Sequence, residues 1–320
     1  MWNEILNKID AAETPLLAIE QWGGQPDSLR LINEGINLVY RFECQQQGYY
    51  LRMTHSSLRK EETLLAAILY QSHLYNHQAP VCEPIVSKQG RWIESILQGQ
   101  ELFLAHVCKE VPGQHVNFSY SQVALYEQWG KALGALHKAA QLFDTGHHHY
   151  VNWSESFDEM SEYVKKESRE IQDVFISVRD YFNQRQQTSY NFGLTHGDHR
   201  EANVITDGQQ VHIIDFDLPS KNWFMEDVAR PFFYPLMHDQ TNWRDKIKPY
   251  LDGYFSIMPK SSIDLSALPK QIQMKGLEIY LWTKNNWSGE LAPGGENTAK
   301  WLDCIYQKLI NSNWIEQLPR

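Results

Sequence analysis

Residues 194–205, LTHGDHREANVI, and residues 213–217, IIDFD, carry the strongest functional signal in this chain. Asp198 precedes Asn203 by five positions, and Asp215 follows Asn203 by twelve. Phosphoryl transfer accounts for such a triplet, because one carboxylate orients the attacking hydroxyl and accepts its proton, while an amide oxygen and a second carboxylate hold Mg²⁺ on a triphosphate. A loop followed by a tight hairpin would bring the three groups together. The alternative is an ordinary turn followed by the end of a strand.

Residues 196–198 (HGD), Asn203 and residues 214–217 (IDFD) resemble the motif pair of the aminoglycoside phosphotransferase and choline kinase superfamily. That superfamily includes type II homoserine kinases and bacterial stress-response kinases. The resemblance implies a protein-kinase-like fold over most of the chain. It also implies that Asp198 is the catalytic base and that Asn203 and Asp215 are the Mg²⁺ ligands of a bound ATP.

Three further residues stand close to these motifs. The resemblance implies that His196 braces its loop and takes no part in the chemistry. Asp217 is frequent in the family as the residue after Asp-Phe, and its role is left open. Asp227 looks like the acid that begins the next helix, and we expect a structural role for it, as an N-terminal carboxylate or a loop brace.

The first hundred residues read as strands around one helix. Apolar and β-branched runs separated by turn signals predict strands. The helix is expected from residue 58 to residue 76, with Ser56 and Ser57 as candidate caps. The expected strands cover residues 29–32, 38–42, 49–53, 92–96 and 102–107.

The remainder of the chain is mostly helical by the spacing of its apolar residues. The helical stretches are expected around residues 125–136, 154–185 with one break, 265–287 and 299–310. The pattern thus predicts the fold class α+β, with a β-rich N-terminal lobe over residues 1–108 and a mostly helical lobe over residues 109–320. The resemblance implies that these lobes form a bilobal protein-kinase-like fold, in which the first binds the nucleotide and the second carries catalysis and substrate binding.

The resemblance places the phosphates of the nucleotide in the N-terminal lobe. Gly35 and Asn37 occupy the turn between the first two strands, whose backbone N–H groups would cradle phosphate; a plain hairpin turn would look the same. Arg52 stands on the third strand, where protein kinases commonly have lysine, and its guanidinium would bind phosphate bidentately. Its expected partner is an acid on the following helix, either Glu61 or Glu62, and Glu62 fits the family helix pattern better.

The resemblance also places the adenine beside residues 105–108, AHVC. In kinase-like folds the backbone at this point pairs with the adenine edge. His106 and Cys108 are therefore the expected contacts of the base, although their side chains are not diagnostic.

Charge and composition exclude several classes of protein. Lys and Arg number 29 against 39 Asp and Glu, a net charge of −10, and no Lys/Arg run exceeds two residues, so nucleic acid is not an expected partner. The longest apolar stretch, residues 64–70, is too short to span a bilayer. Residues 1–10 contain acids and no long apolar run, so we expect no secretory signal there. The 4 cysteines form no Cys-x-x-Cys pair, which is typical of a reduced, cytoplasmic protein.

The acceptor is the least marked part of the site. The acidic charge and the Trp-bearing helices favour a small hydroxyl-bearing molecule that carries an amine, such as an aminoglycoside, choline or a homoserine-like compound. The alternatives are a Ser/Thr protein kinase of the stress-response type and a nucleotide-binding pseudokinase. The choice of ATP or GTP and the oligomeric state stay open. The candidate acceptor-lining residues are Glu155, Asp158, Glu159, Glu162, Glu278, Trp282, Trp287 and Glu290. Residues of these types are more often solvated helix charges or core rings than substrate contacts.

Overall fold

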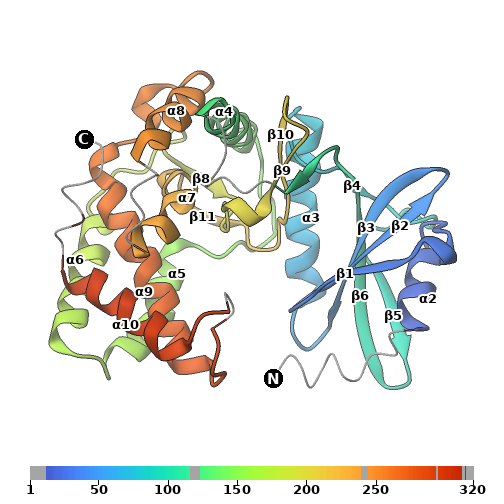
Figure 1. Ribbon diagram of the computed structural model, residues 1–320, viewed down its shortest axis with the longest axis horizontal. Helices are drawn as coiled ribbons and strands as arrows, with labels where there is room; N and C mark the ends of the chain where they lie inside the picture. The colour runs from blue at the N-terminus through green and yellow to red at the C-terminus, as the bar shows by residue number, and fades with distance from the viewer. Residues whose placement is uncertain (1–11, 116–122, 239–243, 293–294, 312–313, 315–320) are drawn as a thin grey trace. The chain divides into compact units, whose positions relative to one another are not determined.

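The structure is a computed structural model that describes residues 12–115, 123–238, 244–292, 295–311 and 314 (Figure 1). Residues 1–10, for which we expect no secretory signal, lie outside this range. By its internal contacts the chain divides into two units. The first comprises Met1–Gln114, Phe143–Tyr150 and Ile205–Asp217, and the second comprises His115–Leu142, Val151–Val204 and Leu218–Arg320. Neither unit is contiguous in sequence, whereas the sequence predicted a single boundary after residue 108.

The first unit is built on an antiparallel sheet in the order β1-β2-β3-β6-β4, with β5 paired to another stretch of β6. A second, three-stranded sheet has the order β10-β9-β7. The elements of the first unit are α2 (Thr14–Glu20), η1 (Pro26–Ser28), β1 (Arg30–Glu34), β2 (Leu38–Cys44), β3 (Gln47–His55), α3 (Glu61–Asn76), β4 (Pro84–Ile85), β5 (Glu94–Gln98), β6 (Glu101–Lys109), β7 (Gln114–His115), β9 (Val204–Thr206) and β10 (Val211–Ile213).

Two apolar clusters hold the first unit together. In the larger one, Phe42 and Leu51 of neighbouring strands are fully buried against Ile19 of α2. In the smaller one, Leu64 of α3 is buried with Leu104 of β6. Burial of such side chains contributes roughly 1.5–3 kcal/mol each relative to exposure, and it fixes the register of the sheet.

The helix of the first unit starts later than the sequence indicates. We expected Ser56 or Ser57 to cap a helix from residue 58, but α3 begins at Glu61 and its N-cap, Lys60, makes no side-chain cap bond. His55 explains the difference. Its ring lies 2.6 Å from the hydroxyl of Ser57, and its carbonyl oxygen accepts hydrogen bonds from the main-chain N–H groups of Leu58 and Arg59. These contacts form a separate turn before the helix.

The second unit is mostly helical, with a two-stranded sheet formed by β8 and β11. Its elements are α4 (Val123–Ala140), α5 (Trp153–Val164), α6 (Arg169–Asn183), β8 (Phe192–Thr195), η3 (Glu201–Asn203), β11 (Ser220–Trp223), α7 (Met225–Met237), α8 (Arg244–Phe255), η4 (Lys260–Ser262), η5 (Leu265–Ala267), α9 (Leu268–Asn286) and α10 (Thr298–Ile310). The single break expected within residues 154–185 is confirmed between α5 and α6. Helix α4 lies against α8 so closely that a Cβ at Gly130 would stand 1.8 Å from the carbonyl oxygen of Tyr250.

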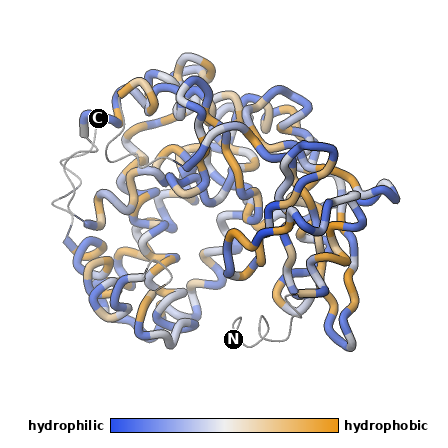
Figure 2. Tube along the Cα trace, turned by 45° about the vertical axis from the view of Figure 1, so that its right-hand side comes forward, coloured by the Kyte–Doolittle hydropathy of each residue, from blue (hydrophilic) through white to orange (hydrophobic). Residues whose placement is uncertain are grey.

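Hydrophobic and hydrophilic residues are interleaved along the chain (Figure 2). No helix among the described residues is long and apolar enough to cross a membrane.

The first unit is rich in β-strands and the second is mostly helical. This arrangement confirms the α+β fold class expected from the sequence.

Candidate active site

The loop after β8 carries Asp198 in a conformation that requires glycine beside it. Gly197 has φ +80°, and a Cβ there would lie 1.9 Å from the carbonyl oxygen of Leu218. L-residues rarely adopt this backbone conformation, and the carbonyl leaves no room for a side chain. The HGD sequence is therefore a tightly constrained turn whose geometry fixes the direction of Asp198.

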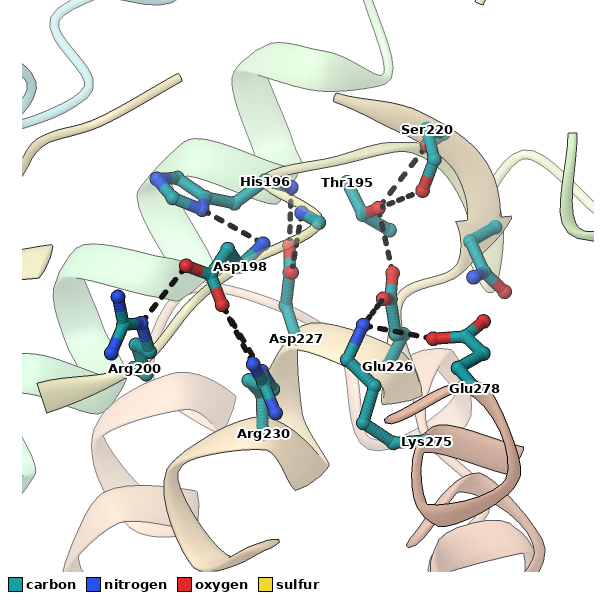
Figure 3. A network of polar contacts seen from close by, with 12 residues as sticks. Thr195, His196, Asp198, Arg200, Ser220, Glu226, Asp227, Arg230, Lys275 and Glu278 are labelled. Carbon is teal, nitrogen blue, oxygen red and sulfur yellow. Dashed lines mark hydrogen bonds and ion pairs between the residues drawn. The ribbon is translucent and has the colours of Figure 1, made fainter. Parts of the chain in front are cut away.

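Asp227, in the first turn of α7, holds this loop by its backbone. Its carboxylate accepts hydrogen bonds from the main-chain N–H of His196 at 2.6 Å and of Gly197 at 3.1 Å (Figure 3). It also lies 3.0 Å from Nε2 of His137, whose Nδ1 is 2.9 Å from the hydroxyl of Tyr254. The expectation of a structural brace is confirmed.

The charge state of the brace follows from its surroundings. Asp227 is fully buried, which opposes ionisation, but its hydrogen bond with His137 and the nearby imidazoles lower its pKa to about 2. Burial lowers the pKa of His137, so that ring is neutral. Because a carboxylate only accepts, Nε2 of His137 carries the proton and Nδ1 accepts from Tyr254.

The carboxylate of Asp198 is held by donors on both oxygens. Nη2 of Arg230, on α7, lies 2.8 Å from Oδ1, and Nε of Arg200 lies 2.9 Å from Oδ2. Figure 3 shows Asp198 between these two guanidinium groups. Burial of Asp198 opposes its ionisation, but Arg230 and Arg200 outweigh that effect and lower its pKa to about 2. Asp198 is therefore ionised throughout the physiological range.

Asn203 lies in the short helix η3, five residues after Asp198, and bonds back to it. Its Nδ2 donates to the main-chain oxygen of Asp198 at 2.8 Å and to Oδ2 at 3.1 Å. With the nitrogen turned toward Asp198, the amide oxygen faces the other way. This orientation suits an oxygen ligand for a hard cation.

A second charged group stands beside this loop. The Oγ1 of Thr195 lies 2.9 Å from Oε2 of Glu226, and Lys275 on α9 lies 3.8 Å from Glu226 and 2.9 Å from Glu278. Burial raises the pKa of Glu226 to about 8, against the opposing effect of Lys275. Glu226 is therefore largely protonated at neutral pH, and the ammonium of Lys275 neutralises Glu278.

In the first unit, Asp215 and Asp217 face Arg52. Nη2 of Arg52 lies 2.8 Å from Oδ1 of Asp215 and 2.8 Å from Oδ2 of Asp217. Asn37 donates to the same oxygen of Asp217, and Nη2 of Arg59 lies 3.2 Å from it. Asp217, whose role the sequence left open, thus links the β1–β2 turn to two cations.

Asp215 has an unusual backbone. Its φ is +70°, a left-handed conformation that is sparsely populated outside glycine. Such outliers cost free energy and cluster at ligand-binding and catalytic sites, where surrounding structure maintains them. The outlier at Asp215 therefore supports a functional role for this residue.

The expected pair between Arg52 and Glu62 is wrong. Arg52 is bound to Asp215 and Asp217, and Glu62 is exposed in the first turn of α3. The reason lies in the chain path after β10, which brings two carboxylates to the guanidinium. Neither Glu61 nor Glu62 pairs with Arg52 in the described part of the chain.

The other expected nucleotide contacts have mixed support. Gly35 does not have a left-handed backbone conformation, and the nearest atom to a Cβ at this position would lie 3.8 Å away. Cys108 is paired on both sides within the sheet, with Tyr50 on β3 and Pro84 on β4. Its main chain is no open edge for a base, which weighs against the adenine contact expected there. His106 is buried opposite Arg52 and pairs with β3.

Several expected acceptor-lining residues have structural roles. Glu155 is the third residue of a capping box with Asn152 at the start of α5. Glu162 is exposed and lies 2.5 Å from Lys165, and Glu278 is paired with Lys275 as described above. Each of these three carboxylates is thus bound by a residue three positions away.

Sequence reasoning missed the cations of the site. Arg230, Arg59 and Lys275 stand outside the quoted motifs, and no local pattern connects them to the carboxylates that they bind. Arg200 was inside the quoted stretch, two residues after Asp198, and that spacing was the only signal available. Among the described residues, no group of three or more His, Cys, Asp or Glu side chains is arranged to hold a metal by itself.

The chain matches the phosphotransferase enzyme family over residues 28–255. It is 22% identical over 274 residues to amicoumacin kinase of Bacillus subtilis (strain 168), which covers 82% of each protein.

Solved structures show the same fold. The amicoumacin kinase hAmiN, in complex with AMP-PNP, Ca²⁺ and Ami, has a TM-score of 0.84 at 18% identity, with 98% of this chain and 97% of that chain covered. A microcompartment-associated aminopropanol kinase has a TM-score of 0.70 at 14% identity, covering 94% and 97%. A choline/ethanolamine kinase family protein from Mesorhizobium loti has a TM-score of 0.65 at 13% identity, covering 99% and 97%.

Proposed function

The chain belongs to the phosphotransferase enzyme family, and we propose that it transfers the γ-phosphoryl group of ATP to a hydroxyl of a small molecule. The observation that carries this proposal is the state of Asp198, which is ionised and oriented by a loop that Asp227 braces from behind. A carboxylate in that state is suited to orient an alcohol for attack on phosphorus.

We assign Asp198 the role of catalytic base with late proton transfer. A carboxylate with a pKa of about 2 is a weak base toward a free alcohol. It does accept the proton once the bond to phosphorus has begun to form, because the hydroxyl then becomes acidic. Orientation and electrostatics would thus supply most of the rate enhancement.

Asn203 and Asp215 are the proposed Mg²⁺ ligands. Their donor atoms, an amide oxygen and a carboxylate oxygen, are the hard ligands that Mg²⁺ prefers, and Mg²⁺ sites commonly combine one or two protein oxygens with phosphates and waters. The metal would neutralise charge on the phosphates. The rotation of Asn203 and the left-handed backbone of Asp215 support this assignment.

Arg52 is the proposed phosphate-binding cation of the first unit. Asp217 and Asn37 fix its surroundings, and Asp215 shares its guanidinium. Asp215 would be shared between Arg52 and the metal, and Asp217 would hold Arg52 in place in either case. Gly35 and His106 stay proposed nucleotide contacts, whereas the geometry gives less support to Cys108 and Glu62.

We further propose that the acceptor carries an amine. The similar proteins named above include kinases of aminopropanol and of the choline/ethanolamine family, whose names denote amino alcohols. The carboxylates near Asp198 do not supply this preference, since Lys275 neutralises Glu278. Recognition of an amine would therefore depend on other parts of the second unit.

The test is a phosphoryl-transfer screen with purified protein, ATP and Mg²⁺. The acceptors are amino alcohols, aminoglycosides, the same alcohols without the amine, and a generic Ser/Thr protein substrate. We expect transfer to at least one amine-bearing small molecule and little to protein. Efficient protein phosphorylation alone would favour the stress-response type of kinase. ATP binding without any transfer would favour a pseudokinase.

A further inference from the structure

The carboxylate of Asp198 has no vacant acceptor position. Oδ1 accepts from Nη2 of Arg230 at 2.8 Å and from its Nε at 3.3 Å. Oδ2 accepts from Nε of Arg200 at 2.9 Å and from Nδ2 of Asn203 at 3.1 Å. An ionised carboxylate offers about four lone-pair positions. A hydroxyl that donates to Asp198 must therefore displace one of these N–H groups.

The two arginines differ in how readily they can leave. The side chain of Arg230 is 8% exposed, whereas that of Arg200 is 41% exposed. Withdrawing the carboxylate from a buried guanidinium leaves an uncompensated buried charge, which is strongly unfavourable. The more exposed guanidinium of Arg200 regains water when its contact breaks, so its loss costs less. Arg200 is the donor that yields.

The packing around Arg230 keeps it in one place. Its guanidinium carbon lies 5.7 Å from the ring centroid of Phe233 and 5.4 Å from that of Tyr234. Its Nη1 is buried without a hydrogen-bond partner in the described part of the chain. Asp198 is thus the carboxylate that fixes this guanidinium, and the two aromatic rings support it.

We propose that Arg230 is a positioning residue that holds Asp198 by Oδ1, while Arg200 is a displaceable donor that marks Oδ2 as the oxygen to which the acceptor hydroxyl binds. This inference rests on the proposed function. In the free protein Arg200 occupies the place of the hydroxyl on Oδ2. Binding of the acceptor breaks that contact and leaves the contacts of Arg230 intact.

The two arginines should therefore differ in kinetics. Arg230→Gln lets the carboxylate rotate, and misplacement of a reacting group by about 1 Å costs on the order of 10²-fold in rate. We expect that loss in kcat, with acceptor KM within about threefold of wild type. Arg200→Gln removes a competitor of the hydroxyl, so acceptor KM should fall. Arg179→Gln, an exposed arginine on α6 that pairs with Asp180, is the matched control and should match wild type in both constants.

Chemical rescue separates positioning from a structural role. Arg230→Ala should regain at least about tenfold in kcat when guanidinium is added at sub-denaturing concentration, because the ion restores the donor to Oδ1. Sodium chloride at equal ionic strength should give no gain, and Arg200→Ala should not respond to guanidinium. If Arg230→Ala does not fold, Arg230→Lys replaces it and should show reduced kcat with unchanged acceptor KM.

Wild type is assayed first, so that the two failures are distinct. If wild type transfers no phosphoryl group to any acceptor, the proposed function fails and this inference fails with it. If wild type is active, near-normal kcat in Arg230→Gln, or in Arg230→Lys where that variant is used, overturns the inference alone. So does rescue by sodium chloride equal to that by guanidinium, or an acceptor KM that rises in Arg200→Gln.

Discussion

The carboxylate of Asp227 lies 2.6 Å from the main-chain nitrogen of His196, so the first turn of α7 holds the loop that carries Asp198. The bond joins a fully buried side chain to a fully buried backbone group. Such a contact transmits the position of a helix to a functional side chain two residues away. The orientation of Asp198 therefore depends on Asp227 although the two carboxylates have different partners.

Asp227→Asn should destabilise the protein and reduce activity together. An amide offers one oxygen to three donors and turns its NH₂ toward one of them, so a buried donor loses its partner. We expect a loss of about 3 kcal/mol in the free energy of unfolding, measured by urea denaturation. Asp303→Asn, exposed on α10, is the control. An unchanged free energy of unfolding in Asp227→Asn would contradict the brace.

Arg52→Ala should raise the ATP concentration needed for half-maximal rate more than it lowers kcat. The variant loses the guanidinium proposed to contact the phosphates and leaves Asp217 with fewer cations. Arg52→Lys should be intermediate, since it keeps the charge and loses the planar fork. Isothermal titration with Mg²⁺·ATP measures the effect, with Arg91→Ala as an exposed control. Equal affinity in Arg52→Ala and wild type would show that Arg52 has no part in nucleotide binding.

Asp217→Asn and Glu62→Gln form a matched pair that tests which acid supports Arg52. Asp217 lies 2.8 Å from Nη2 of Arg52, and Glu62 is exposed. Asp217→Asn should therefore weaken nucleotide binding by about tenfold or more, as expected for loss of a buried ion-pair partner. Glu62→Gln should change it little. The reverse order of effects would restore the partner expected from the sequence.

Glu226→Gln should remove part of the pH dependence of stability. The pKa of Glu226 is raised from 4.5 to about 8 in the folded chain, chiefly by burial. Its stabilising contribution is therefore complete below about pH 4.5 and is lost as the pH rises through 8, because the unfolded chain then binds fewer protons. At pH 8.5 the Gln variant should be more stable than wild type by about 1 kcal/mol or more, and at pH 5 the two should be similar. Parallel curves of unfolding free energy against pH would contradict the raised pKa.

The motifs at residues 196–217 supplied most of the information about the candidate site that the sequence contains. Local spacing selected Asp198, Asn203 and Asp215 as candidates, and the apolar patterns located β1, β2, β3, β5, β6 and most helices. These signals depend on neighbours in the chain. The start of α3 was misplaced because His55, not a cap residue, organises the turn before it.

The partners of the site could not be predicted in the same way. Arg230 binds Asp198 across 32 positions, and Arg52 binds Asp217 across 165. Pairs at such separations are set by tertiary packing, and one sequence contains no pattern that connects them. The expected pair of Arg52 with Glu62 was wrong for that reason. Asp215 and Asp217 are distant from Arg52 in sequence, and only the folded chain brings them to its guanidinium.

The most direct test of the account is single-turnover transfer from Mg²⁺·ATP in Asp198→Asn, run beside wild type with an acceptor found in the screen. The amide keeps the size of the side chain but loses the charge and the capacity to accept a proton. We predict a fall of roughly 10²-fold or more in the transfer rate, with Mg²⁺·ATP affinity by titration close to that of wild type. Transfer at a near-normal rate would contradict the role of Asp198 and with it the proposed mechanism.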